Sequence, residues 1–120
     1  MKLAIPCDTD EGLDSRRSGH FGHCAYFVLV DIEDGEVKGV SSVKNVDHDA
    51  VGCGGVIQYA IDLGIDAILA AGMGYPPFSR FTQSGVHVYL DRSVLRAGDA
   101  VDLLLAGKVS DMSEDQACKH

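Results

Sequence analysis

The sequence predicts one α/β domain, built on a mixed five-stranded sheet with helices on both faces. Two features predict this fold: a hairpin-rich first half, and a second half in which short apolar runs alternate with segments of helical periodicity. Strands that alternate with helices are joined by right-handed crossovers, which place helices on both faces of the sheet. The 120 residues, 46% of them apolar, fit a single globular domain. We expect the domain to span residues 1–107, followed by a flexible, charged tail over residues 108–120.

The first half predicts three strands. Residues 2–6 form a short apolar run that is typical of a buried strand. Residues 25–32 are apolar on both alternating faces, which is typical of a central strand covered on each side. Asp34-Gly35 is a strong hairpin signal, and residues 36–44 then return as a more polar strand, which we expect at an edge of the sheet.

The second half predicts three helices and two strands. In chain order they are a helix opened by residues 52–55 and closed by Gly64, a strand over 66–71, a helix over 76–85, a strand over 86–90 and a helix capped by Ser93. Glycine commonly ends helices, proline suits a first helical turn, and serine is a good N-terminal cap. Loops at the ends of the parallel strands should meet at one edge of the sheet, where ligands commonly bind.

The composition argues against several kinds of partner. The net charge is −8 and only 10 residues are Lys or Arg, so neither a nucleic acid nor a membrane surface is expected. No apolar run approaches the ~18 residues of a membrane-spanning helix, and residues 1–7 are too short an apolar run for a signal peptide. We therefore expect a cytosolic protein whose four cysteines are thiols or metal ligands rather than disulfides.

Residues 18–24 concentrate metal-ligand side chains in front of the second strand. His20, His23 and Cys24 fall within five positions, between glycines and one phenylalanine. Imidazole and thiolate together favour Zn, Cu, Fe or an iron–sulfur cluster over Mg or Ca. Each side chain also has a simpler interpretation: the histidines as exposed or structural residues, and Cys24 as a small core residue.

Cys53 is the strongest thiol candidate. It lies among glycines at the expected start of a helix, where free N–H groups and the helix dipole stabilise a thiolate or another anion. The alternative is a glycine-rich turn with an incidental cysteine. His48 lies five residues upstream and could complete such a site, although Asp47-His48-Asp49 is equally typical of a solvated turn.

Met73 stands between two glycines after the strand over 66–71. We expect its thioether to project from the loop, as a soft ligand or as a wall that shields the site. No pair of CxxC motifs and no glycine-rich phosphate-loop motif is present, so the sequence predicts neither a zinc ribbon nor a nucleotide site.

Several segments together resemble the dinitrogenase iron–molybdenum cofactor biosynthesis family, over about residues 1–106. They are Ser18-Gly19-His20-Phe21-Gly22, the strand that follows, Asn45 with His48, Gly52-Cys53-Gly54, and Ala71-Gly72-Met73-Gly74 with Phe81 and Gly85-Val86. The resemblance implies a ribonuclease-H-like fold and a carrier or scaffold for iron–sulfur and molybdenum-containing clusters rather than a catalyst.

By position, the resemblance makes His20 the first candidate for contact with a cluster, with Cys53 and Met73 in the other ligand-like segments. Backbone N–H groups of the accompanying glycines, Gly54 and Gly72, would bind the sulfides of an anionic cluster. The chain lacks the histidine-rich stretch of some members and has only His48 there.

The leading hypothesis is a small cytosolic carrier, not an enzyme, which holds an iron–sulfur or molybdenum/iron–sulfur cluster between donor and acceptor proteins. His20 and Cys53 would ligate the cluster, with help from His23, Cys24, His48 and Met73. We expect a monomer or a weak homodimer. Two alternatives stay open: an enzyme that uses Cys53 as a thiolate nucleophile, and a regulatory or interaction module without a cofactor.

Overall fold

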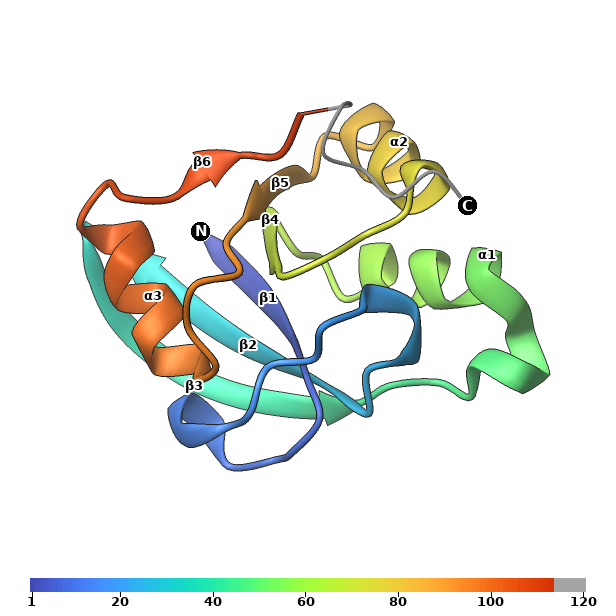
Figure 1. Ribbon diagram of the computed structural model, residues 1–120, viewed down its shortest axis with the longest axis horizontal. Coiled ribbons are helices and arrows are strands. Elements are labelled where there is room, and N and C mark those ends of the chain that lie inside the picture. The colour runs from blue at the N-terminus through green and yellow to red at the C-terminus, as the bar shows by residue number, and fades with distance from the viewer. Residues whose placement is uncertain (114–120) are drawn as a thin grey trace.

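A computed structural model describes residues 1–113, except for the side chains of residues 48–51 and 53. Within this range six strands form one sheet in the spatial order β3-β2-β1-β4-β5-β6 (Figure 1). The strands are β1 (Lys2–Cys7), β2 (Tyr26–Glu33), β3 (Glu36–Lys44), β4 (Ala67–Ala70), β5 (His87–Leu90) and β6 (Ser110–Asp111). The β1–β4 and β4–β5 pairs are parallel, and the other three pairs are antiparallel.

The hairpin between β2 and β3 turns at the predicted dipeptide. Asp34 and Gly35 have φ angles of 54° and 75°, so both residues adopt the left-handed conformation. A two-residue hairpin of this kind matches the twist of its strands, and Asp-Gly is one of the sequences that adopts it easily. The strand β3 lies at one edge of the sheet, as its polar sequence predicts.

Three helices cover both faces of the sheet, as predicted. They are α1 (His48–Asp62), α2 (Tyr75–Gln83) and α3 (Ala97–Leu105). Figure 1 shows α1 and α2 on one side of the sheet and α3 on the other. Successive strand residues alternate between two apolar cores: Ala4 belongs to the core under α1 and α2, whereas Leu3 and Ile5 belong to the core under α3.

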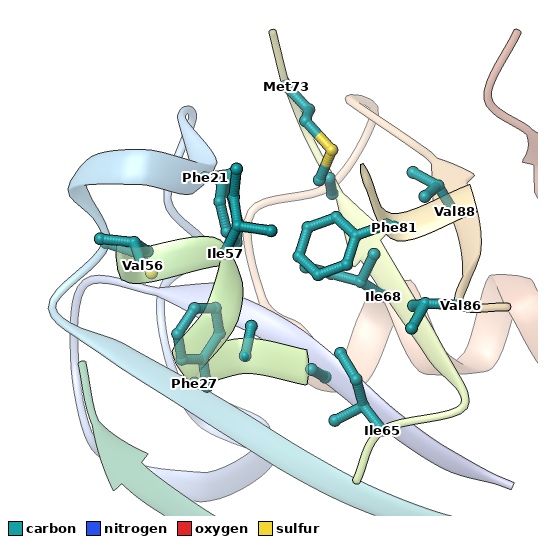
Figure 2. Packing of buried hydrophobic residues seen from close by; sticks show 14 of the residues in the cluster. Phe21, Phe27, Val56, Ile57, Ile65, Ile68, Met73, Phe81, Val86 and Val88 are labelled. Carbon is teal, nitrogen blue, oxygen red and sulfur yellow. The ribbon is translucent and has the colours of Figure 1, made fainter. Parts of the chain in front are cut away.

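The core under α1 and α2 takes one of its largest side chains from a loop. Phe21 is 1% exposed and lies between β1 and β2 in the sequence. Its ring meets Phe81 of α2 edge to face at 5.3 Å and Phe27 of β2 at 5.9 Å (Figure 2). Such aromatic pairs stabilise by about 0.5–1.5 kcal/mol beyond the burial of their area. The loop is therefore anchored in the core by its own side chain.

Two details differ from the sequence-based predictions. The prediction of five strands is wrong, because Ser110 and Asp111 pair with β5 as a sixth strand, and Met112 beside them is buried. The last helix begins after Arg96 rather than at Ser93, whose hydroxyl donates to the Asp91 carboxylate instead. Residues 114–120, the remainder of the expected tail, lie outside the described residues.

None of the helices in residues 1–113 has both the length and the apolar character that a membrane span requires.

Candidate functional site

The loop of residues 18–24, here called the HFG loop, lies where the ends of β1 and β4 meet the start of β2. The Ser18 amide donates to the Pro6 carbonyl of β1 at 3.0 Å, and the Phe21 amide donates to the Gly72 carbonyl after β4 at 3.2 Å. The predicted gathering of these loops at one edge of the sheet is thus present. Because both bonds use backbone groups, the loop is held in place independently of its imidazoles.

Gly72 packs against the HFG loop at very short range. A Cβ atom on Gly72 would lie 2.7 Å from the Gly19 carbonyl oxygen, closer than any ordinary side-chain contact. The sequence had placed Gly72 among the residues that bind a cofactor. The structure gives this glycine a packing role, since a side chain would push the two loops apart.

The two histidines of the HFG loop lie side by side at the surface. Their ring centroids are 5.6 Å apart with an angle of 42° between the ring planes, and both residues are exposed. The short helical turn η2 (Phe21–His23) follows His20, whose Nδ1 accepts a hydrogen bond from the Gly22 amide at 3.3 Å. In the neutral ring this places the proton of His20 on Nε2.

Cys24 does not present a thiolate to this surface. It is 4% exposed, and burial raises its pKa to about 12, with the neighbouring Cys7 and Asp8 adding to the shift. The Asn45 side-chain amide donates to the Cys24 carbonyl at 2.9 Å and lies 3.5 Å from the Cys24 sulfur. Cys24 is thus a protonated core thiol, and its expected role as a metal ligand is not supported by this environment.

Met73 also differs from its predicted orientation. Its side chain is fully buried, and Figure 2 shows it pointing toward Phe81 inside the core under α1 and α2. The expectation that the thioether projects from the loop is therefore wrong. The loop turns inward after Gly72, so the sulfur lies among apolar neighbours and would have to leave the core to meet a metal.

The third predicted segment lies on α1. The helix is interrupted at Gly52, which has φ 72° and ψ 177°, so a new helical segment begins immediately after it. Gly54 is exposed there, and its carbonyl accepts a long hydrogen bond of 3.5 Å from Arg80. The side chains of His48 and Cys53 lie outside the described residues, so their predicted roles as ligands stay predictions.

A groove of about 400 Å³ runs from the HFG loop to the end of β3. His23, Tyr26, Lys44 and Asn45 are among its lining residues. Over the residues described by the structure, no three His, Cys, Asp or Glu side chains are placed to hold one metal ion. This part of the chain offers two adjacent exposed imidazoles instead. Asn45 lines this groove, and the sequence pointed to it only through the family resemblance.

Comparison with known proteins places the chain in context. It is 31% identical over 111 residues to the uncharacterised protein MJ0580 of Methanocaldococcus jannaschii, covering 91% of this chain and 89% of that protein. The crystal structure of PH0822 is 33% identical, with a TM-score of 0.79 and coverage of 93% of this chain and 96% of the other.

The apo form of the orange protein from Desulfovibrio gigas has the same fold at 24% identity, with a TM-score of 0.78 and coverage of 93% and 92%. Residues 1–107 match the family described as dinitrogenase iron-molybdenum cofactor. This match spans all of the chain up to the end of α3. The chain belongs to the dinitrogenase iron-molybdenum cofactor family.

Proposed function

We propose that this protein binds and carries an iron–sulfur or molybdenum/iron–sulfur cluster, or a precursor of one, and passes it from donor to acceptor proteins during metallocofactor assembly. The observation that carries the proposal is the pair of exposed imidazoles, His20 and His23, on a loop fixed at the meeting point of two strand ends. Membership of a cofactor-related family supports a metal–sulfur cluster as the ligand of this surface.

His20 would contribute mainly as a hydrogen-bond donor. Its Nδ1 already accepts from the Gly22 amide, so the proton on Nε2 can be donated to a sulfide of an anionic cluster. Direct coordination through Nε2 would require the proton to move to Nδ1 and the bond from Gly22 to break. A donor role leaves the bond from the Gly22 amide in place.

Cys53 would supply the thiolate. A helical segment begins after Gly52, and the N–H groups and positive dipole end of a helix start stabilise an anionic ligand such as a thiolate. A single thiolate with hydrogen bonds leaves the cluster incompletely ligated, which suits a protein that must release its cargo.

The proposal includes a non-catalytic role, a cytosolic location and a ribonuclease-H-like arrangement of the sheet. These three parts of the proposal rest on the family resemblance. The competing hypothesis of a thiolate enzyme depends on the same Cys53, so the experiment below separates the two by its readout.

The test is anaerobic reconstitution of the full chain with iron and sulfide, and separately with tetrathiomolybdate. Metal analysis and visible absorption are compared for the wild type, His20→Ala, His20→Gln and Cys53→Ala. His87→Ala is the matched control, because His87 is an exposed histidine on β5, away from the HFG loop. We expect stoichiometric charge-transfer bands that weaken in His20→Ala and Cys53→Ala and persist in His87→Ala.

The glutamine variant separates donation from ligation, because its side-chain amide keeps an N–H donor without an imidazole. Bands retained in His20→Gln and lost in His20→Ala indicate a donor, whereas equal loss indicates a ligand. A wild-type protein that takes up neither cluster refutes the carrier proposal. Turnover of a small molecule that needs no metal and stops on Cys53 alkylation would support the enzyme instead.

A further inference from the structure

A second cavity lies at the carboxyl ends of the three parallel strands. It has a volume of about 370 Å³ and takes its walls from the segments that follow β1, β4 and β5, represented by Ser18, Gly72 and Leu95. It shares no lining residue with the groove beside His23. Crevices outside the carboxyl ends of parallel strands, where the chain crosses to opposite sides of the sheet, are the usual ligand sites of α/β folds.

The cavity is basic in an acidic protein. The chain has a net charge of −8, yet four of its five arginines gather around this edge. Arg17 and Arg92 line the cavity, and Arg16 pairs with Arg96 through an isolated backbone bridge next to it. Asp91 forms an ion pair with Arg17 at 3.1 Å. Arg17 therefore has a carboxylate partner, whereas no ion pair of Arg92 is found among the described residues.

Arg17 holds an unused donor at this wall. Its side chain is 2% exposed, and its two terminal nitrogens donate to the Asp91 carboxylate, the Asp91 carbonyl and the Val94 carbonyl. Its Nε has no hydrogen-bond partner among residues 1–113. Buried N–H groups of a cation are rarely left unsatisfied in native structures. An acceptor that reached this Nε from the cavity would satisfy it.

The remaining wall is apolar. Ala71, Val94 and Leu95 line it, and Leu95 is 73% exposed, the largest exposed fraction among the large hydrophobic residues that the structure describes. The volume is within the range of sites for small organic ligands, which combine apolar walls with a few well-placed polar groups. A bare inorganic anion has no apolar surface that could pack against this wall.

We propose that this cavity binds a small organic anion, with a phosphate or carboxylate head facing Arg17 and Arg92 and an apolar body against Val94 and Leu95. Arginine forms bidentate bonds with both kinds of head. The walls contain neither imidazole nor thiol, but Ser18 and Gly19 of the HFG loop form part of them. Binding is therefore measured on the metal-free full chain.

The first experiment compares fragments of such a ligand at low ionic strength. Phenyl phosphate and benzoate carry both parts, inorganic phosphate carries the head alone, and phenol carries the body alone. We expect the tighter of the two complete probes to bind at least fivefold more tightly than either fragment, with amide chemical-shift changes centred on Ser18, Gly19 and Gly72. The better complete probe identifies the head. Absence of saturable binding by both complete probes overturns the proposal.

Variants at exposed positions locate the site without disturbing the core. Arg92→Gln should weaken binding of the better complete probe about tenfold, as expected for loss of a charged hydrogen bond. Arg80→Gln is the matched control, since Arg80 is exposed on α2 and does not line the cavity, and it should leave the affinity unchanged.

Leu95→Ser should weaken the complete probe and leave inorganic phosphate unaffected, because only the complete probe contacts the apolar wall. Equal effects of Arg92→Gln and Arg80→Gln would show non-specific charge attraction and overturn the assignment. Chemical-shift changes confined to other segments of the chain would also overturn the assignment.

Discussion

Replacing Gly72 by alanine tests whether the HFG loop is held by close packing against the segment after β4. The added Cβ would lie 2.7 Å from the Gly19 carbonyl oxygen, and the loops would have to separate by about 0.7 Å to restore an ordinary contact. The same two segments share the bond from the Phe21 amide to the Gly72 carbonyl at 3.2 Å. Separation of the two loops would therefore disrupt their packing and also lengthen this hydrogen bond.

The expected cost follows from these two effects. Inserting a methyl group into a well-packed region costs about 1–3 kcal/mol, and a weakened backbone hydrogen bond adds up to about 1 kcal/mol. Gly72→Ala should thus lower the free energy of unfolding by about 2–3 kcal/mol. In a domain of this size that corresponds to a fall in Tm of roughly 10 °C.

Gly19→Ala is the control from the other side of the same contact. A Cβ on Gly19 meets no atom within 4 Å, and this residue does not need a positive φ angle. We expect its unfolding free energy to stay within about 0.5 kcal/mol of the wild type. Urea and thermal unfolding of both variants provide the measurement. A Gly72→Ala protein as stable as Gly19→Ala would refute the packing role of Gly72.

Three further predictions concern buried groups near the same edge. Met73 is fully buried, so Met73→Ala should lower the free energy of unfolding in urea by about 2–5 kcal/mol and Met73→Leu by less than about 1.5 kcal/mol. A smaller loss for alanine than for leucine would contradict the core role of Met73. The pKa of Cys24 is raised from near 9 to about 12, so the protonated thiol stabilises the fold below pH 9 and that stability is lost as the pH rises toward 12. Between pH 8 and 10.5, the free energy of unfolding of the wild type should therefore fall by about 2 kcal/mol more than that of Cys24→Ala, as measured by urea unfolding at each pH. Equal falls would show that Cys24 is not buried as a thiol. Asp91→Asn should lower the free energy of unfolding by about 3 kcal/mol, because the Arg17 charge stays buried without its charged partner. An unchanged free energy in urea unfolding would show that the ion pair is dispensable.

The sheet could be predicted from the sequence because its strands carry strong periodic signals. Residues 25–32 are apolar on both faces, and the strand they form is covered by a core on each side. The sixth strand escaped prediction since Ser110 and Asp111 are two polar residues that pair only because β5 offers its free edge. Short pairings of this kind depend on tertiary context rather than on local pattern.

The sequence predicted which loops of the site come together, but it did not predict the direction in which their side chains point. Strand order implied that the segments around His20 and Gly72 would meet, and they do. The inward turn of Met73 and the burial of Cys24 follow from how the loop between two strands packs on the core, which no spacing encodes. Arg17 was passed over because a pair of arginines in an acidic loop resembles solvated charge; its fixed position comes from Asp91, 74 residues away in the chain.

Phe21 links the fold of this edge to the surface it presents. Its ring is buried between Phe27 and Phe81, and its backbone amide bonds to Gly72, so the residue next to His20 is fixed by the core and by the segment after β4. A ligand that contacts His20 therefore meets a loop already ordered, and little conformational entropy is lost on binding. The same anchoring means that affinity at this surface must come from the few groups it exposes, which is what the proposed carrier role requires.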